Sequence, residues 1–323
     1  MTPYISVVVP TMRVGGLDVL WSGLVQQTFK DFELVLVDGI QARIGSIDFP
    51  GIAWQHVAPF NNEFPVASFC HYANTGLVHA RGEIVFMMVD YTWLPPETLE
   101  AHAAWHRRHD DPRAALMMPH EYRELPVLAF TFGNGIPFDY RSGTGDPALD
   151  NAEARRYAQN VASGAHDAHF WSIFNHPFNA DDDARHLAVH PKWGGADPKN
   201  RLVCPPGESV LLDNTYFHAK NESVKRSMLL DANGWDEDLD GTHCFQDNDL
   251  SDRLTRKHDV TWFLRKDAIA QIVNPRTVFP FAERERDYMT NLLLWKSKQA
   301  AGYVEPVNTW SLREKRKELR IDG

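Results

Sequence analysis

Residues 5–11 read ISVVVPT, and residues 32–39 read FELVLVDG. Both are apolar runs of strand length that end at polar or turn-forming residues, a pattern typical of strands buried on both faces of a sheet. The stretch 17–27 between them has apolar residues at helical spacing. A strand, a helix and another strand in this order predict a parallel βαβ unit.

The same alternation continues through the first third of the chain. We predict a weak strand at 52–57, a helix at 69–80, a strand at 84–89, a helix at 97–108 and a strand at 114–118. Regular segments return at 209–212, 215–218 and 227–230, followed by a helix at 249–257, a strand at 260–264 and a helical tail at 281–299. These signals predict one large α/β domain with a mostly parallel sheet flanked by helices.

Residues 119–206 break this pattern, with scattered glycines and prolines, many His and Trp, and no clear periodicity. A segment of this length without regular secondary structure inside a compact domain usually has a function. We therefore divide the chain into a regular part at 1–118, an irregular insertion at 119–206, a second regular part of the same domain at 207–282 and a C-terminal helical tail at 283–323.

The composition narrows the class of protein. The chain has 323 residues, of which 33 are basic and 43 acidic, so that its formal net charge is −10, the opposite of a protein that grips phosphate backbones without specificity. Its three cysteines lack metal or disulfide spacing, which favours a reducing compartment. Because no apolar run approaches ~18 residues, we expect a cytoplasmic protein without a transmembrane segment.

Polar side chains follow several predicted strands, at the edge of an α/β sheet where ligands bind. Thr11 and Arg13 follow the first strand, Asp38 the second and Asp90 the fourth, and residues 246–249 open a helix with carboxylates. A guanidinium suits phosphate oxygens, and a carboxylate suits a base or ribose. A structural alternative stays open for each acidic group, because Asp also favours turns and helix N-caps.

Several motifs occur together in a fixed order. They are ISVVVPT at 5–11, QQTFKDFELVLVDG at 26–39, NTGL at 74–77 with ARGEIV at 80–85, and GWDE at 234–237 with QDNDLSDRL at 246–254. As an ordered set they resemble glycosyltransferase family 2, the GT-A fold nucleotide-sugar transferases. The resemblance covers about residues 4–118 and 209–265. It implies that 1–118 is the nucleotide-sugar-binding half, 119–206 an acceptor-side insertion and 207–282 the acceptor and catalytic half of the same domain.

The resemblance implies an inverting transferase that moves a sugar from a nucleotide diphosphate, UDP in preference to GDP or dTDP, to an acceptor hydroxyl. Asp247 would be the general base that removes the hydroxyl proton. Asp38 would accept from the base edge, and Asn74 would lie near the diphosphate. The implied nucleotide-sugar residues are Pro10, Thr11, Arg13, Asp38, Asn74 and Asp90. The implied donor-sugar and acceptor residues are Trp235, which would stack on a sugar ring, Asp236 and Gln246.

The metal motif of the family is incomplete in this chain. Family members carry Asp-x-Asp after the fourth strand to hold Mn²⁺ or Mg²⁺, whereas residues 89–91 are Val-Asp-Tyr and leave Asp90 alone. One carboxylate beside substrate phosphates can still serve Mg²⁺, because this ion keeps several waters. The late His of the family has no match near Asn274, so that Arg13 or another cation is the alternative partner of the leaving group. Gln246 replaces the Glu that usually precedes the base.

Two other functions stay open. The incomplete metal motif allows a catalytically degenerate GT-A protein that binds a nucleotide or glycan without transfer. A dehydrogenase is the weaker alternative, because Gly15 and Gly16 do not form the dinucleotide-binding fingerprint. The acceptor is open among a glycan, a lipid-linked compound, a protein and a modified nucleic-acid base.

The remaining polar clusters favour structural interpretations. Histidines at 120, 166, 169, 176, 186 and 190 lack the Cys or carboxylate pattern of a zinc or manganese site and are interpreted as surface or packing residues. The mixed charges at 313–320 favour a solvated terminal helix, with peripheral contact to an anionic membrane as the alternative. We expect the tail to dock on the body or on a second copy of the chain.

Overall fold

The computed structural model describes residues 2–11, 17–39, 49–61, 69–90, 92–109, 111–118, 120–123, 209–212, 217–241, 244–265, 268, 270–273, 281–303 and 305–321. Most of the irregular insertion at 119–206 lies outside these residues, as do Arg13, Tyr91 and Asn274. Of the histidines considered above as metal ligands, His120 is the one inside them.

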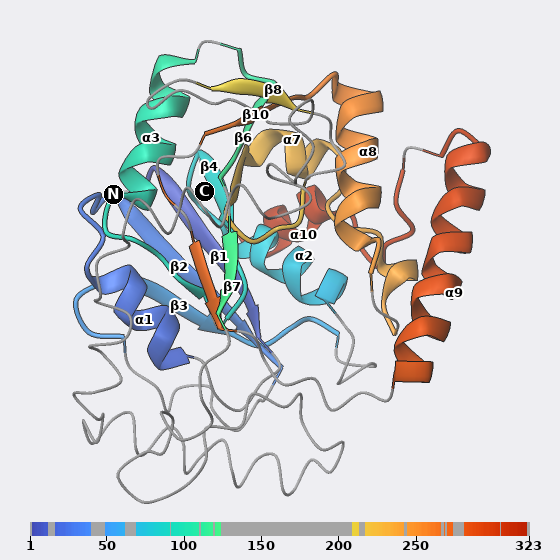
Figure 1. Ribbon diagram of the computed structural model, residues 1–323, viewed down its shortest axis with the longest axis horizontal. Helices are drawn as coiled ribbons and strands as arrows, with labels where there is room; N and C mark the ends of the chain where they lie inside the picture. Colours follow the sequence, from blue (N-terminus) through green and yellow to red (C-terminus); the bar gives the residue numbers. More distant parts are fainter. Residues whose placement is uncertain are drawn as a thin grey trace, which may run out of the picture.

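The described part of the chain builds an eight-stranded sheet (Figure 1). In spatial order its strands are β3 (Ala53–Val57), β2 (Phe32–Asp38), β1 (Ile5–Thr11), β4 (Ile84–Met87), β9 (Glu222–Lys225), β6 (Ala114–Met117), β10 (Thr261–Leu264) and β8 (Val210–Leu212). β9 and β8 run opposite to the others, which are parallel to one another. A smaller sheet consists of β5 (Thr92–Trp93), β11 (Ala270–Val273) and β7 (His120–Arg123).

Helices cover both faces of the large sheet (Figure 1). One face carries α1 (Leu17–Val25) and α3 (Thr98–Arg108). The other carries α2 (Phe69–His79), α7 (Arg226–Asp231), α8 (Gln246–His258) and α10 (Leu312–Glu318). The long helix α9 (Phe281–Ala300) lies outside α8, and a short 3₁₀ helix spans Glu237–Leu239. No helix within the described ranges has both the length and the apolar character that crossing a membrane requires.

Successive strand residues point to opposite faces of the sheet, and both faces are buried. Val7 of β1 and Leu34 of β2 belong to the core beneath α1 and α3, whereas Val8 and Val35 belong to the core beneath α2. Burial on both faces explains why these strands are apolar at successive positions. The predicted GT-A type fold class, a mostly parallel sheet flanked by helices with a helical C-terminal tail, is confirmed.

The second half of the sheet differs from the sequence prediction. The sequence does not predict β9, because its residues Glu-Ser-Val-Lys are mostly polar and show no apolar run. The regular signal at 227–230 belongs to helix α7. Of the segment 215–218, residues 217–218 are described and do not form a strand.

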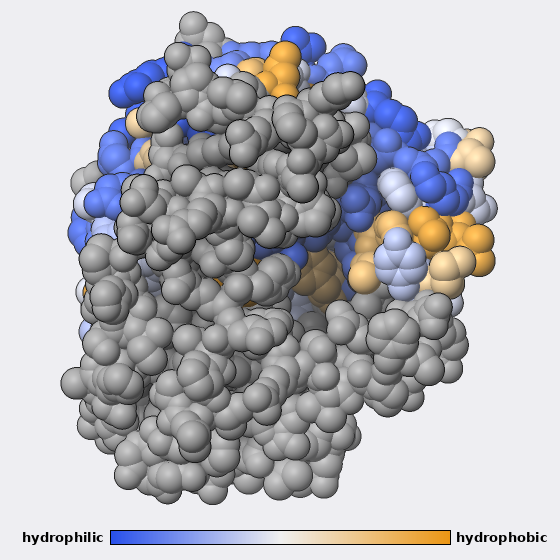
Figure 2. Space-filling model, in the orientation of Figure 1, coloured by the Kyte–Doolittle hydropathy of each residue, from blue (hydrophilic) through white to orange (hydrophobic). Residues whose placement is uncertain are grey.

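The C-terminal tail packs against the body of the domain. Lys298 of α9 contacts Asp236 at 2.5 Å, and Leu312 of α10 belongs to the core beneath α2. Figure 2 shows apolar side chains over α9, where Met289 and Leu293 are 45% and 65% exposed. Docking of the tail on the body is therefore observed, and its contact with a second copy stays a prediction.

Helix α2 is held at both ends by charged side chains. At its N-terminus the Asp240 carboxylate accepts the main-chain N–H groups of Cys70 and His71 at 2.8 and 2.9 Å. At its C-terminus the buried Arg316 guanidinium donates to the main-chain oxygens of residues 77, 78 and 80, at 3.1, 2.6 and 2.5 Å. The charges match the helix dipole at each end and satisfy main-chain groups that have no partner within the helix.

Replacing Arg316 with Met should destabilise the fold by about 3 kcal/mol, because buried main-chain oxygens at the end of α2 lose a charged donor. Urea unfolding measures the change. Arg313→Met is the matched control on the same helix: Arg313 is exposed and pairs with Asp231, so that we expect a loss of less than ~1 kcal/mol. Equal effects of the two substitutions would contradict a capping role for Arg316.

Candidate functional site

The candidate site lies where the carboxyl ends of neighbouring strands meet. Thr11 at the end of β1 is level with Asp38 at the end of β2. Further along the sheet, Glu222 at the start of the antiparallel strand β9 is level with both Met87 and Met117, the last residues of β4 and β6. Polar residues of three strands, β1, β2 and β9, therefore lie at the edge at which open α/β sheets bind ligands.

Thr11 and Asp90 contact each other at this edge. The Thr11 hydroxyl donates to Asp90 Oδ2 at 2.6 Å, and the main-chain oxygen of Thr11 accepts the N–H of Gly39 at 2.9 Å. Both side chains are almost completely buried. The contacts fix the ends of β1 and β2 and the segment after β4 relative to one another.

Asp38 is fully buried beside two ring-bearing side chains. His56 Nε2 lies 3.0 Å from Asp38 Oδ2. Burial raises the pKa of Tyr72, and the nearby Asp38 charge adds to this effect. The Tyr72 hydroxyl occupies the space next to residue 39, where a Cβ would lie only 2.3 Å from it, so that any residue other than glycine at position 39 would displace the Tyr72 ring.

Asp247 lies in the first turn of α8, directly after a strained main-chain segment. Cys244 and Phe245 have φ angles of 79° and 69°, in the left-handed region that costs roughly 1–3 kcal/mol for a residue other than glycine. The tail helix supports this segment: the Asn291 amide donates to the main-chain oxygen of Cys244 at 2.9 Å, and Trp295 stacks on Phe245 at 5.3 Å between ring centroids. Strain that surrounding contacts maintain is frequent at functional sites.

The environment of the Asp247 carboxyl group adjusts its proton affinity. Burial raises its pKa to about 6, while the hydrogen bond from the Trp235 indole and the charge of Lys220 oppose this rise. The indole nitrogen lies 3.2 Å from Asp247 Oδ1. A carboxyl group that titrates close to neutral pH is suited to general base catalysis.

Asn74 fixes the main chain of Trp235 from both sides. Its side-chain oxygen accepts the Trp235 N–H at 2.8 Å, and its side-chain nitrogen donates to the Trp235 oxygen at 2.9 Å and to Glu237 Oε1 at 3.1 Å. A Cβ at residue 234 would lie 2.2 Å from Asn74 Oδ1, which together with a φ of +68° explains Gly234. These contacts connect the motif NTGL at 74–77 to the motif GWDE at 234–237. The contact of Asn74 with a diphosphate stays a prediction.

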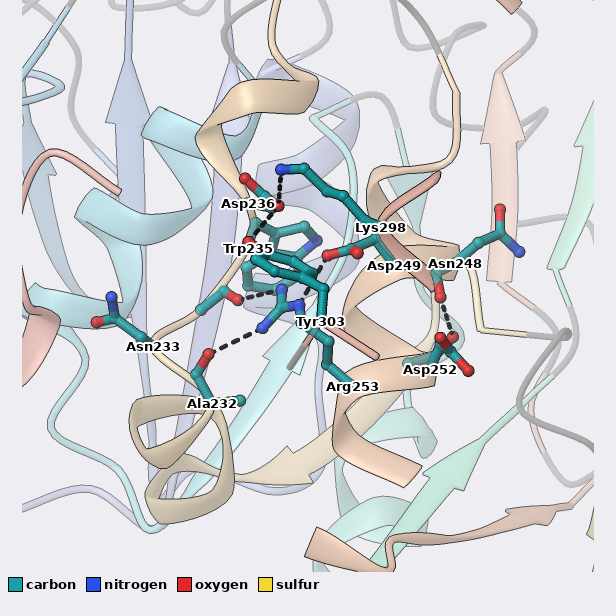
Figure 3. Close-up of polar contacts among 12 residues, drawn as sticks. Ala232, Asn233, Trp235, Asp236, Asn248, Asp249, Asp252, Arg253, Lys298 and Tyr303 are labelled. Carbon is teal, nitrogen blue, oxygen red and sulfur yellow. Dashed lines mark hydrogen bonds and ion pairs between the residues drawn. The ribbon is translucent and has the colours of Figure 1, made fainter. Parts of the chain in front are cut away.

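Trp235 and Asp236, predicted to contact the donor sugar and acceptor, lie in the interior of the described structure, and their contact with a sugar stays a prediction. Both are fully buried, and the Trp235 ring packs edge-on against Phe69 at 6.0 Å. Asp236 Oδ2 contacts Lys298 Nζ and accepts from the Tyr303 hydroxyl, both at 2.5 Å (Figure 3). Because the Trp235 side chain is fully buried, stacking of its ring on a sugar would require this arrangement to open.

Arg253, near the end of the motif QDNDLSDRL, makes structural contacts. Its fully buried guanidinium pairs with Asp249 Oδ2 at 2.8 Å and donates to the main-chain oxygens of Ala232 and Gly234 at 2.8 and 2.7 Å (Figure 3). One side chain thereby connects α8 to the turn that precedes Trp235.

Three further residues, Pro10, Gln246 and Arg13, are predicted from the sequence to belong to the site. Pro10 is buried within β1, level with Val37 of β2. Gln246 is partly buried, and its side chain donates to the main-chain oxygen of Leu239 at 3.2 Å. Arg13 lies outside the described residues.

The described residues do not form a metal site by themselves. No group of three or more His, Cys, Asp or Glu side chains among them is arranged to hold a cation. Asp90 offers one carboxylate, which already accepts the Thr11 hydroxyl. One carboxylate fits a magnesium ion that arrives with nucleotide phosphates and keeps several waters, but not a cage made of protein ligands alone.

Two charged residues that the sequence interpretation did not single out interact with Asp247. The charge of Lys220 lowers the pKa of Asp247, and the charge of Asp247 raises the pKa of Glu222. Burial raises the pKa of Glu222 to about 7, with a smaller contribution from Asp247. No motif marks these residues, because they lie at and just before the polar strand β9.

Comparisons with known proteins find similarity at the level of structure. No family model matches the sequence, and no curated protein sequence matches it significantly. The crystal structure of S. aureus TarS 1–349 has a TM-score of 0.48 and 13% identity over 91% of this chain and 64% of that chain. The same fragment in complex with UDP has a TM-score of 0.43 and 14% identity over 83% and 60% of the two chains. Its complex with UDP-GlcNAc has a TM-score of 0.39 and 14% identity over 84% and 59%.

The chain therefore spans about three fifths of the length of the TarS fragments it is similar to.

Replacing Trp235 with Phe removes the indole donor and keeps a buried aromatic ring. Because this donor favours the ionised carboxylate, we expect the pKa of Asp247 to rise above its value of about 6, by roughly one unit. Carboxyl ¹³C NMR titration measures it. Trp262→Phe is the control, since the Trp262 indole donates to Thr255 at 2.9 Å. An Asp247 pKa that is the same in wild type and Trp235→Phe would show that the indole does not stabilise the charge.

Proposed function

We propose that the protein is a cytoplasmic, inverting glycosyltransferase that moves a sugar from a nucleotide diphosphate, UDP in preference to other nucleotides, to an acceptor hydroxyl. The observation that carries the proposal is the Asp247 carboxyl group in the first turn of α8: burial raises its pKa to about 6, and it accepts a hydrogen bond from the Trp235 indole at 3.2 Å. The order of motifs around it, which resembles glycosyltransferase family 2, supports the same activity.

In the proposed reaction Asp247 is the general base. Its carboxylate takes the proton of the acceptor hydroxyl while the hydroxyl oxygen forms a bond to the anomeric carbon. The bond between that carbon and the diphosphate oxygen breaks, and its electron pair leaves with the diphosphate. A single displacement of this kind inverts the configuration at the anomeric carbon.

The nucleotide would lie along the ends of β1, β2 and β4. In the free protein the polar groups there are paired with one another, Thr11 with Asp90 at 2.6 Å and Asp38 with His56 at 3.0 Å. Donor binding would exchange some of these contacts for contacts to the base, ribose and phosphates. The acceptor, whether a glycan, a lipid-linked compound, a protein or a modified base, would present its hydroxyl at the start of α8.

Replacing Asp247 with Asn should abolish transfer, by about 10²- to 10⁴-fold, because the amide cannot accept the proton at neutral pH. Donor affinity should change by less than about threefold, because the substitution conserves size and the carboxylate does not hold the nucleotide. Release of nucleoside diphosphate measures turnover, and calorimetry measures donor binding. Asp252→Asn is the control on the same helix, since Asp252 pairs with Arg256 at 2.8 Å.

Normal turnover by Asp247→Asn would rule out the proposed mechanism. If the wild-type protein binds a nucleotide sugar but releases no nucleoside diphosphate, even by slow hydrolysis, the catalytically degenerate alternative is correct instead. A thermal-shift screen of nucleotide sugars identifies the donor for both measurements.

We propose further that a divalent cation, Mg²⁺ or Mn²⁺, enters with the donor and is contacted by Asp90. Such a cation would neutralise charge on the departing diphosphate. EDTA should then lower turnover at least about tenfold, with recovery on adding Mg²⁺ or Mn²⁺. Undiminished turnover in EDTA would show that Asp90 does not work through a cation and that a side-chain cation serves the leaving group.

A further inference from the structure

The His71 ring lies between two buried carboxylates. His71 is in the first turn of α2, one turn before Asn74 on the same side of the helix. Its Nδ1 atom lies 2.6 Å from Asp240 Oδ2, and its Nε2 atom lies 3.2 Å from Glu237 Oε2. The Asn61 amide, 3.4 Å from Nε2, can turn its oxygen toward the ring as well. Both ring nitrogens therefore have a carboxylate oxygen beside them.

Both carboxylates also accept hydrogen bonds from other groups. Glu237 Oε1 accepts from the Asn74 amide nitrogen at 3.1 Å, and Glu237 Oε2 accepts from the main-chain N–H and the hydroxyl group of Thr309 at 2.8 and 2.9 Å. Asp240 accepts two main-chain N–H groups at the start of α2, at 2.8 and 2.9 Å. Hydrogen bonds that a carboxyl group accepts favour its ionised form. The two groups are therefore ionised in this arrangement.

A positive charge on His71 balances these two carboxylates. Buried charges are stable in proteins when they are paired. Among the described residues, His71 is the basic side chain that forms an ion pair with Glu237 or Asp240. A neutral imidazole has a single N–H, whereas an imidazolium has one on each nitrogen and offers a proton to both carboxylates. The geometry therefore favours a ring that is protonated at both nitrogens.

We infer that His71 is a positioning residue for the general base, an inference that rests on the proposed function. Its positive charge holds the Glu237 carboxylate, and Glu237 holds the Asn74 amide that fixes the main chain of Trp235. The Trp235 indole in turn donates to Asp247 at 3.2 Å.

Glu237 determines which way the Asn74 amide faces. The two ends of an amide group have nearly the same shape, so that its hydrogen-bond partners decide its orientation. Glu237 Oε1 accepts from the amide nitrogen, and the same nitrogen donates to the Trp235 oxygen at 2.9 Å. This leaves the amide oxygen free to accept the Trp235 N–H at 2.8 Å. A Glu237 carboxylate that moves away weakens the orientation on which both contacts with Trp235 depend.

The other side chains next to His71 carry no charge at neutral pH. Burial above all raises the pKa of the Cys70 thiol and of the Tyr72 hydroxyl, so that both neighbours in α2 stay protonated. Asn61 and Thr309, which reach the two ion pairs from other segments, have no ionisable group. Among the described residues, the charge of the ring is therefore opposed directly by the two carboxylates.

The first measurement needs no substitution. Imidazole ¹⁵N NMR of the full chain, assigned through the bonds of each ring to its Cβ, distinguishes a doubly protonated ring from a neutral one. Neighbouring carboxylates favour the charged form, so that His71 should stay doubly protonated at about pH 7.5, where an ordinary histidine is mostly neutral. His79 in the last turn of α2 is the internal control: burial lowers its pKa, and its ring should be neutral at this pH. A neutral His71 ring at about pH 7.5 overturns the inference.

The second measurement compares His71→Gln, which removes the charge, with His71→Lys, which keeps a cation. Carboxyl ¹³C NMR gives the pKa of Asp247 without any substrate. In His71→Gln this pKa should rise above its value of about 6, by up to roughly one unit, because the Trp235 indole is no longer held against the carboxylate. His71→Lys and the control His79→Gln should stay near the wild-type value.

The same variants predict a change in the pH dependence of nucleoside diphosphate release. The acid limb of the profile should move upward in His71→Gln by as much as the pKa of Asp247 does. At about pH 5 that shift is a loss of rate of up to roughly tenfold, and the loss should disappear above about pH 8, where the base is ionised in every variant.

Combination with Trp235→Phe shows whether the effect travels through the indole. If it does, the double variant His71→Gln/Trp235→Phe should have the Asp247 pKa of Trp235→Phe alone, because both substitutions remove the same hydrogen bond. Additive rises overturn the inference, because the charge of His71 then acts on Asp247 directly.

An unchanged pKa of Asp247 in a folded His71→Gln variant overturns the inference as well. If that variant does not fold, Glu237→Gln replaces it: with one carboxylate removed, His71 should become neutral at a lower pH than in the wild type, and an unchanged titration contradicts the inference. If all the NMR results are as expected but no nucleotide sugar yields nucleoside diphosphate, the proposed function is wrong while the link between His71 and Asp247 stands.

Discussion

The paired hydrogen bonds between the Asn74 side chain and the main chain of Trp235 are the contact on which the candidate site depends. They engage both the N–H and the oxygen of one residue, at 2.8 and 2.9 Å, as a neighbouring strand would. With its main chain fixed, Trp235 presents its indole N–H to Asp247 at 3.2 Å. A buried carboxylate without such a donor is costly. The hydrogen bonds from Asn74 on α2 to the main chain of Trp235 therefore influence the pKa of Asp247 on α8.

Because Asn74 lies on α2, the contacts that position α2 also position the candidate site. Its ends are held by Asp240 and by Arg316, which lies in the last helix of the described chain. The tail also supplies Asn291, which supports the strained turn before Asp247, and Lys298, which pairs with Asp236. The C-terminal helices are thus part of the scaffold of the site rather than an appendage, although they lie outside the region of family resemblance.

The sequence predicts the first half of the sheet well because burial on both faces leaves mainly apolar runs, as in residues 5–9 and 32–37, whose buried polar residues Ser6 and Glu33 hydrogen-bond to each other. Its motifs also assign Asn74, Trp235 and Asp247 to one site, and in the structure Trp235 contacts both of the others. It does not predict the full burial of Trp235 and Asp236, since a pattern of residue types does not say whether a side chain faces solvent or the core. The contacts of Glu222 with main-chain N–H groups leave no pattern in the sequence at all.

The polar strand β9 shows why the missing information is structural. A strand between β4 and β6 is expected to be apolar, and Glu222 and Ser223 are tolerated there because N–H groups of the preceding turn and two neutral histidines of α3 satisfy them. An apolar pair would form the same ladder without holding the turn at 220–221 in place. The polar residues of β9 therefore give the turn before the strand a fixed position, and hydrogen bonds of this kind leave no periodic pattern from which the sequence could predict them.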